Sequence, residues 1–225
     1  MALNARLRAV ADFVRGGALV VDVGCDHALL PIELIRSGKA SRVIASDIGE
    51  GPLSSARKNI ERAGLDDRIE TRLSDGLAGV SPDEVDHVIV AGMGGDLISW
   101  IIDAAKWTRS GKYRFIFQPM TSADDLRRYL IANGFVIDCE RAVYDAHRLY
   151  TVMQCRFDGN RREYPPEYEY IGEVTTSTAE GRDYLQRQIR RIDSRLRSLE
   201  NARDDHPEKA ELETILQALK KRLED

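Results

Sequence analysis

The chain has 225 residues, of which 43% are hydrophobic and 31% charged, and 33 Lys and Arg against 37 Asp and Glu give a net charge of −4. This composition supports a sizeable core and excludes global disorder. The mild acidity argues against a protein that coats nucleic acid by charge alone, while a local basic patch remains compatible with it. Three scattered cysteines without a CxxC pair predict neither a disulfide framework nor a zinc site, and fit a reducing compartment.

Targeting and membrane signals are missing from the sequence. The first residues lack the apolar run of a signal peptide, and no stretch approaches the roughly 20 apolar residues that span a bilayer. We therefore expect a cytoplasmic protein without membrane contact.

The first 157 residues alternate between amphipathic helices and apolar strands. Helices are predicted over residues 3–14, 29–37, 52–63 and 122–132, and strands over 18–24, 41–48, 68–75, 86–93 and 113–120. This alternation predicts a parallel sheet with right-handed crossovers. Two extended runs within 135–157 have no helix between them and predict an antiparallel hairpin at the sheet edge. Residues 1–157 thus read as one doubly wound, Rossmann-like α/β domain.

The composition changes at about residue 158. Pro165 and Pro166 prevent a helix there, and beyond them Leu and Ile recur at spacings of 3 and 4 over 185–199 and 212–223. The pattern predicts an antiparallel coiled-coil hairpin as a second domain, residues 158–225. Residues 182–203 carry seven arginines against three acids, which favours either an ordinary solvated face or an arm that contacts RNA phosphates.

Acidic residues follow three successive predicted strands. In an open parallel sheet, ligands bind beyond the carboxyl ends of the strands, where Asp22, Asp47 and Asp75 stand. Asp47, 25 positions after Asp22, suits a carboxylate that accepts hydrogen bonds from ribose hydroxyls. The adenine of S-adenosylmethionine (SAM) usually meets a polar residue at the position of Asp75. Each acid alone could be a helix cap or a turn residue, but the three together predict a SAM site.

The loop after the first strand distinguishes between two cofactors. Its sequence, GCDHAL (24–29), lacks the further glycines of the GxGxxG dinucleotide fingerprint, which disfavours a pyrophosphate. The negative charges of Asp22 and Asp26 suit the cationic ammonium and sulfonium of SAM instead. Cys25 is expected to be a small turn residue rather than a nucleophile, and His27 to order the loop rather than transfer protons. The histidines show no ligand spacing, so no metal is predicted.

The fourth and fifth strand ends predict the substrate side of the cleft. The glycines of Ala91-Gly92-Met93-Gly94-Gly95 would let a flat base approach the backbone, or else form a tight turn before a helix. Gln118, followed by Pro119, offers a donor and an acceptor to a base edge, unless it only ends the strand.

The motifs DVGCDHALLPIEL (22–34), SDI (46–48), SDGL (74–77), AGMGG (91–95) and FQPM (117–120) closely resemble the bacterial TrmK family. Its members are SAM-dependent tRNA (adenine-N1)-methyltransferases that modify adenine 22. The resemblance covers residues 1 to about 157, and the helical hairpin fits the family's architecture. It implies a Rossmann-like methyltransferase with SAM as cofactor, tRNA as partner, and the target adenine between the 91–95 loop and Gln118. No obligate protein partner is inferred.

The expected site residues follow from the strand ends and from this resemblance. Those expected to bind the cofactor are Asp22, Gly24, Cys25, Asp26, His27, Asp47, Ile48, Asp75, Gly76, Ala91, Gly92 and Met93. Those expected to bind the substrate are Gly94, Gly95, Gln118, Pro119, Arg187, Arg190 and Arg191.

The predicted reaction needs no obligatory general base, because adenine N1 carries an in-plane lone pair. Asp26 is the candidate catalytic residue, either stabilising the positive charge that develops on the base or accepting from its exocyclic amine. Arg6, Arg8 and Arg15 are expected to join the 182–203 helix in contacting RNA. The alternatives are a SAM methyltransferase acting on another RNA, a protein or a small molecule, a non-catalytic RNA-binding protein that retains the pocket, and a coiled-coil adaptor.

Overall fold

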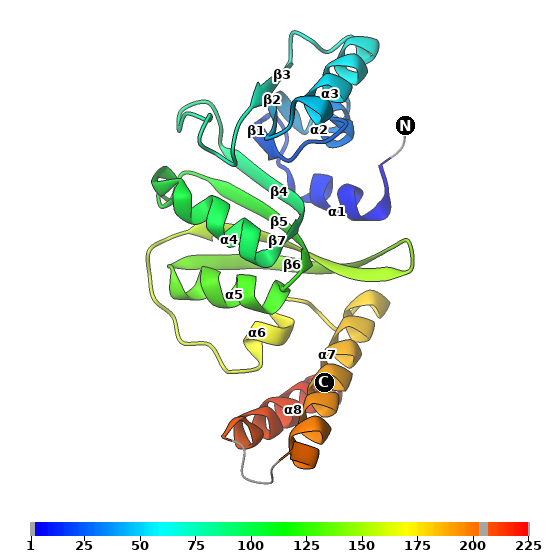
Figure 1. The fold of residues 1–225 in the computed structure, drawn as a ribbon, viewed down its shortest axis with the longest axis vertical. Coiled ribbons are helices and arrows are strands. Elements are labelled where there is room, and N and C mark those ends of the chain that lie inside the picture. The colour runs from blue at the N-terminus through cyan, green and yellow to red at the C-terminus, as the bar shows by residue number, and fades with distance from the viewer. Residues whose placement is uncertain (1–2, 203–206, 225) are drawn as a thin grey trace.

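The computed structural model describes residues 3–202 and 207–224 (Figure 1). Its helices are α1 (Ala5–Phe13), α2 (Leu29–Arg36), α3 (Glu50–Ala63), α4 (Gly95–Ala104), the short 3-10 helix η1 (Lys106–Thr108), α5 (Ala123–Ala132), α6 (Tyr168–Ile171), α7 (Ala179–Ala202) and α8 (Glu208–Glu224). Its strands are β1 (Ala18–Val23), β2 (Ala40–Asp47), β3 (Ile69–Leu73), β4 (His87–Gly94), β5 (Arg114–Thr121), β6 (Phe135–Asp145) and β7 (Arg148–Phe157).

The strands form a seven-stranded sheet in the order β3-β2-β1-β4-β5-β7-β6. The first five run parallel, and β7 pairs antiparallel with both β5 and β6. The predicted Rossmann-like sheet with an antiparallel hairpin at its edge is therefore confirmed. The strand order reverses between β1 and β4, so the carboxyl ends of these two strands flank the crevice in which such folds bind ligands.

Helices cover both faces of the sheet, which explains why its central strands are apolar on each side. On one face, α1, α2 and α3 pack through buried residues such as Val10, Leu34 and Leu53. On the other, α4 and α5 pack through Ile98 and Leu126. Because α1 lies across β4, β5, β6 and β7 rather than beside β1, its first turn approaches the carboxyl end of β4.

The C-terminal helices α7 and α8 pack against each other beneath the sheet in the view of Figure 1, as expected for a helical hairpin. Their shared cluster includes Leu185, Ile192 and Leu219, together with Ala142 and Leu149 from β6 and β7. The hairpin thus shares a core with the edge of the sheet. Its coiled-coil geometry and the domain boundary at 157/158 remain predictions, and Arg203, the last residue of the expected RNA arm, lies outside the described residues.

Candidate functional site

A cavity of about 220 Å³ lies at the switch point between β1 and β4. Its walls come from α1, from the end of β1 and the loop that follows, and from the end of β4. The lining residues are Arg6, Leu7, Asp22, Gly24, Cys25, Asp26, His27, Leu29, Leu30, Ala91 and Gly92. The structure therefore brings together the β1 and β4 groups that the sequence pointed to.

The loop after β1 is folded tightly against β2. The amides of Gly24 and Cys25 both donate to the Ser46 carbonyl, at 2.8 and 2.9 Å. Gly24 has φ +76°, a conformation that favours glycine, and a Cβ there would also displace the terminal methyl of Met93. Asp26 itself has φ +48°. This left-handed turn holds Asp26 at the rim of the cavity, with a solvent-exposed side chain.

His27 stands next to Asp26 on the same rim, with 3.7 Å between its Nε2 and the Asp26 Oδ1, and both side chains are more than half exposed. The side chain of Asn59 on α3 donates to the His27 carbonyl at 3.0 Å, which ties the loop to the neighbouring helix. This contact involves the backbone of His27, and the expected role of its side chain in ordering the loop stays a prediction. Burial, followed by the charge of Asp22, raises the pKa of the Cys25 thiol far above its ordinary value, which disfavours the thiolate that a nucleophile needs.

Asp22 is the buried acid of the site, with 4% of its surface exposed. Among the described residues its carboxylate makes no hydrogen bond, although it lines the cavity. Burial, and secondly the Asp47 carboxylate, raise the pKa of Asp22 to about 7. A buried acid without a partner in a cavity wall is an energetic cost that a bound cation would relieve.

Two further acids continue the site along the carboxyl edge. Asp47 is half-buried, and its Oδ1 accepts from the Gly49 amide at 2.9 Å, which leaves its other oxygen open. The next residue, Ile48, is 71% exposed, which is unusual for so apolar a side chain. Asp75 is exposed at the end of β3. These positions provide carboxylates and an apolar surface side by side at one edge of the sheet.

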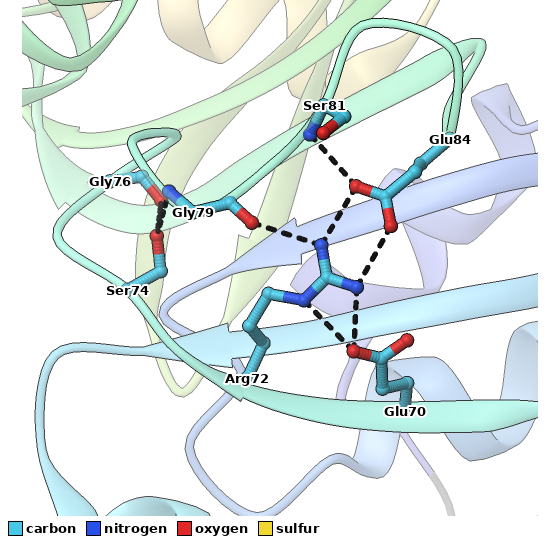
Figure 2. Close-up of polar contacts among 7 residues, drawn as sticks. All are labelled: Glu70, Arg72, Ser74, Gly76, Gly79, Ser81 and Glu84. Atoms are coloured by element: carbon cyan, nitrogen blue, oxygen red, sulfur yellow. Dashed lines mark hydrogen bonds and ion pairs between the residues drawn. The ribbon is translucent and has the colours of Figure 1, made fainter.

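The loop that carries Asp75 is held in place by Arg72 (Figure 2). The Arg72 guanidinium donates to Glu70, to Glu84 at 2.8 and 2.9 Å, and to the Gly79 carbonyl at 2.9 Å. The Ser74 hydroxyl bridges the Gly76 carbonyl and the Gly79 amide from within the loop. Arg72 is not singled out by the sequence, because an arginine on an outer strand also suits an ordinary solvated face.

Gln118 corrects an expectation about the substrate side. Its side chain is fully buried, its Oε1 accepts from Arg6 and from the Gly92 amide at 3.1 Å, and its Nε2 donates to the Pro119 carbonyl at 2.8 Å. The predicted contact of Gln118 with a base edge is therefore wrong in this geometry, since both ends of the amide are occupied. Pro119 is buried as well.

The glycine loop after β4 divides into two parts. Gly92, with φ +82°, faces the cavity, where a Cβ would lie 3.4 Å from the Arg6 guanidinium. Gly95 is buried, and a Cβ there would overlap the Ser122 carbonyl, so this glycine serves the packing of α4 against the β5–α5 turn. Gly94 is half-buried at the start of α4. The open part of the loop is thus Ala91 and Gly92 rather than Gly94 and Gly95.

The three predicted substrate arginines of α7 lie together but have different surroundings. Arg187 donates to the Leu149 carbonyl at 3.1 Å, and Arg191 pairs with Asp124 at 2.7 Å. Arg190 is exposed beside Tyr144, at the end of the β6–β7 hairpin. All three side chains remain exposed, so the two structural contacts leave their charges open to solvent.

Arg6 and Arg15 were both expected to contact RNA, but they lie at opposite edges of the sheet. Arg6 lines the switch-point cavity, whereas Arg15 lines a separate cavity of about 430 Å³ with Asp86, His87 and Lys112. That cavity lies at the amino ends of β1, β4 and β5, on the opposite edge of the sheet. Arg15 is therefore not part of the same surface as Arg6.

Within residues 3–202 and 207–224, no group of His, Cys, Asp and Glu could hold a metal ion. No helix in the described part of the chain is long and apolar enough to span a membrane.

Comparisons with known proteins match both the sheet and the C-terminal helices. Residues 3–153 match the family described as "Methyltransferase domain". The curated tRNA (adenine(22)-N(1))-methyltransferase of Bacillus subtilis is 37% identical over 151 residues, which cover 67% of this chain and 63% of that protein. This chain therefore spans somewhat less than two thirds of that relative.

Two solved structures match nearly the whole chain. A candidate tRNA (m1A22) methyltransferase of Streptococcus pneumoniae is 31% identical, with a TM-score of 0.85 over 99% of this chain and 100% of that one. M. capricolum TrmK, in complex with the cofactor product S-adenosyl-homocysteine, is 25% identical, with a TM-score of 0.81 over 100% of this chain and 99% of that one.

Proposed function

Because the chain belongs to the methyltransferase-domain family, we propose that it methylates N1 of adenine 22 in tRNA with SAM as the methyl donor. The observation that carries the proposal is an acid-lined cavity at the switch point, in a chain whose similarity to tRNA (m1A22) methyltransferase structures includes the C-terminal helices. A cytoplasmic location belongs to the same proposal, because tRNA is modified there.

The residues of the cavity fit the charge and shape of this cofactor. The buried, unpaired Asp22 carboxylate and the exposed Asp26 carboxylate face a ligand end that carries an ammonium and a sulfonium. Asp47 has a free carboxylate oxygen for ribose hydroxyls, and Ile48 exposes apolar surface for a flat adenine. Asp75, in the loop held by Arg72, is the proposed acceptor for the adenine amine, which its exposed carboxylate supports. The backbone of Gly24 itself lines the cavity, so no side chain from this position separates it from a ligand.

When bound, the cofactor supplies a methyl group, which passes from its sulfonium sulfur to the N1 lone pair and leaves a thioether and a cationic 1-methyladenine. The chain's contribution is to align N1 with the sulfur–methyl bond and to exclude water, for which the Gly92 backbone provides a close wall. The Asp26 carboxylate at the rim stabilises the positive charge that develops on the base. No side chain has to remove a proton, because N1 of neutral adenine carries none.

The N1 atom lies on the Watson–Crick edge, so the adenine must leave its stack before it can reach the cavity. Extrusion costs a few kcal/mol, which contacts with the RNA backbone have to offset. We assign part of this contact to the exposed arginines Arg187, Arg190 and Arg191 of α7, which lie beside the β6–β7 hairpin. Arg8, exposed on α1, is available on the catalytic side.

The test is transfer of labelled methyl from SAM to unmodified bacterial tRNA, followed by nuclease digestion and mass spectrometry of the nucleosides. The proposal expects 1-methyladenosine, and expects it to disappear when adenine 22 is replaced by guanine. Transfer to a tRNA lacking adenine 22, or no transfer by a protein that binds SAM in calorimetry, would contradict it. The second result would direct the search to another RNA, a protein or a small molecule as acceptor.

A further inference from the structure

Arg6 is the single arginine or lysine among the described residues that line the switch-point cavity. It comes from the first turns of α1, and its side chain is 16% exposed, so it is not an ordinary surface arginine. The acids that line the cavity are Asp22 and Asp26. A lone guanidinium therefore faces a cavity whose remaining charge is negative.

The Arg6 side chain is held by two partners on one side. Its Nη1 donates to the buried Gln118 Oε1, and its Nε lies 3.9 Å from the Asp145 Oδ2 at the tip of β6. Gln118 is itself fixed by the Gly92 amide and by the Pro119 carbonyl. Arg6 Nη2 makes no hydrogen bond within the described residues. The guanidinium is thus oriented at one edge and free at the other.

This arrangement is more than an anchor of α1 to the sheet. A neutral amide and a carboxylate at 3.9 Å do not match the five N–H donors of a guanidinium, which favours bidentate contact with a carboxylate or phosphate. Gly92 has no side chain beside the guanidinium, where a Cβ would lie 3.4 Å from Nη1. The unpaired Nη2 therefore offers donors to an anionic group from the wall of the cavity.

The amino-acid end of the proposed cofactor carries one anionic group, a carboxylate, next to its ammonium. Asp22 and Asp26 attract the ammonium but repel this carboxylate, so a site made of acids alone would bind the amino-acid end poorly. We infer that Arg6 binds the carboxylate of the cofactor's amino-acid end and that buried Gln118 is the positioning residue that aims it. This inference rests on the proposed use of SAM.

A phosphate of the RNA is the other anion that an arginine here could meet. The burial of Arg6 and its place in the wall of the cavity favour the smaller ligand. Arg8, two residues further along α1, is exposed and provides the contrast. The cofactor and the RNA can be separated experimentally, because SAM can be compared with its decarboxylated form, which keeps the ammonium and the sulfonium.

The experiment measures, by calorimetry, the affinities of the full chain for SAM, for decarboxylated SAM and for 5′-methylthioadenosine, which lacks the amino-acid end. The wild type is expected to prefer SAM over the decarboxylated form by roughly 10- to 100-fold. Arg6→Met should abolish this preference and leave the affinity for 5′-methylthioadenosine unchanged. Arg6→Lys should retain part of the preference, Gln118→Leu should reduce it, and Arg8→Met should keep it.

An Arg6→Met protein that keeps the wild-type preference would overturn the inference, as would a wild type without a preference. So would a variant that loses only tRNA affinity, which would make Arg6 a phosphate contact. Unchanged binding of 5′-methylthioadenosine shows that a variant is folded, so a collapsed site cannot imitate the expected result. If the preference behaves as expected and no 1-methyladenosine forms on tRNA, the role of Arg6 stands and the proposed acceptor is wrong.

Discussion

Arg127 of α5 and Glu140 of β6 form an ion pair, with 2.5 Å between Nη2 and Oε1, in which neither side chain is exposed to solvent. Arg127 also donates to the Tyr184 hydroxyl of α7 at 3.0 Å and to the Glu169 and Tyr170 carbonyls of α6. One guanidinium therefore connects the edge of the sheet to the first turns of the C-terminal hairpin. The position of α7 against the edge of the sheet depends on this connection.

Removing the charge of Glu140 should destabilise the protein strongly. Glu140→Gln leaves the Arg127 guanidinium buried without a counter-ion, a change that costs about 3–5 kcal/mol in comparable pairs. We expect a correspondingly lower free energy of unfolding in urea. Glu163→Gln, at an exposed position, is the matched control and should change stability by less than about 0.5 kcal/mol. Equal stability of the two variants would show that Arg127 is neutralised by other groups.

The buried Asp22 predicts a cost in stability at neutral and alkaline pH. Its pKa is raised from 3.8 to about 7, chiefly by burial and then by Asp47, so the folded state keeps a proton that the unfolded state has released. Stability contributed by this proton is complete below about pH 4 and is lost as the pH rises through about 7. Asp22→Asn stays neutral and should exceed the wild type by up to about 4 kcal/mol at pH 8. At pH 4 the two proteins should unfold alike, and a pH-independent difference would contradict the assignment.

The same carboxylate predicts how SAM binding depends on pH. If Asp22 faces the cationic end of the cofactor, binding favours its ionised form, so affinity should rise with pH until about 7 and then level off. Calorimetry at pH 6 in buffers of different ionisation enthalpy should detect the release of up to one proton. Asp22→Asn should remove the pH dependence together with most of the affinity. Proton uptake on binding would show that the carboxylate does not face a cation.

The guanidinium of Arg72, bonded to Glu70, Glu84 and the Gly79 carbonyl, forms a clamp on the loop that carries Asp75. We predict that this residue, although it lies outside the cavity, affects the cofactor site. Arg72→Ala frees the loop that carries Asp75, so SAM affinity should fall roughly 3- to 10-fold and the amides of residues 74–84 should exchange faster. Arg57→Ala, which removes an exposed pair with Glu50 on α3, is the control. Faster exchange of the loop without any loss of SAM affinity would remove Asp75 from the binding site.

The clamp should withstand acid. The hydrogen bonds from Arg72, and then from the Ser81 amide, lower the pKa of Glu84 to about 2 from its ordinary 4.5. A group with a depressed folded pKa contributes stability above its unfolded value, and this is lost as the pH falls through the folded value. The slow exchange of the 74–84 loop should therefore persist at pH 4 and end near pH 2. Because Glu84 is partly exposed, salt should weaken the clamp.

The sequence predicts the strands and their acids because both depend on short-range patterns. Runs such as Val88–Val90 identify a strand buried on both faces, and the residues that follow it mark its carboxyl end. The family resemblance, carried by these strand ends, is confirmed by the matches to TrmK. The predicted C-terminal helices are also present, because leucines at spacings of 3 and 4 depend only on helical periodicity.

Pairings between distant side chains could not be predicted in this way. Arg6 and Gln118 are 112 positions apart, and their contact depends on α1 lying across β4 and β5. A glutamine at a strand end has the same local pattern whether it faces a ligand or an arginine, so the expected base contact was wrong. The sequence also did not predict the ion pairs of Arg72 with Glu84 and of Arg127 with Glu140. The partner of a long charged side chain depends on how the helices and strands pack, which local patterns do not show.

The exposed α7 arginines give the last prediction, on RNA binding. Replacing Arg187, Arg190 and Arg191 together by alanine should weaken tRNA binding roughly 10- to 100-fold at low salt. The slope of log affinity against log salt should fall by about 2, since each lost phosphate contact removes about 0.7–0.9. SAM affinity should stay as it is, and loss of the Arg191–Asp124 pair should lower stability slightly. Replacing Arg57, Lys58 and Arg62 on α3, at the far end of the sheet, removes the same charge (Figure 1). If both triple variants bind tRNA alike, α7 is not the RNA-contacting arm.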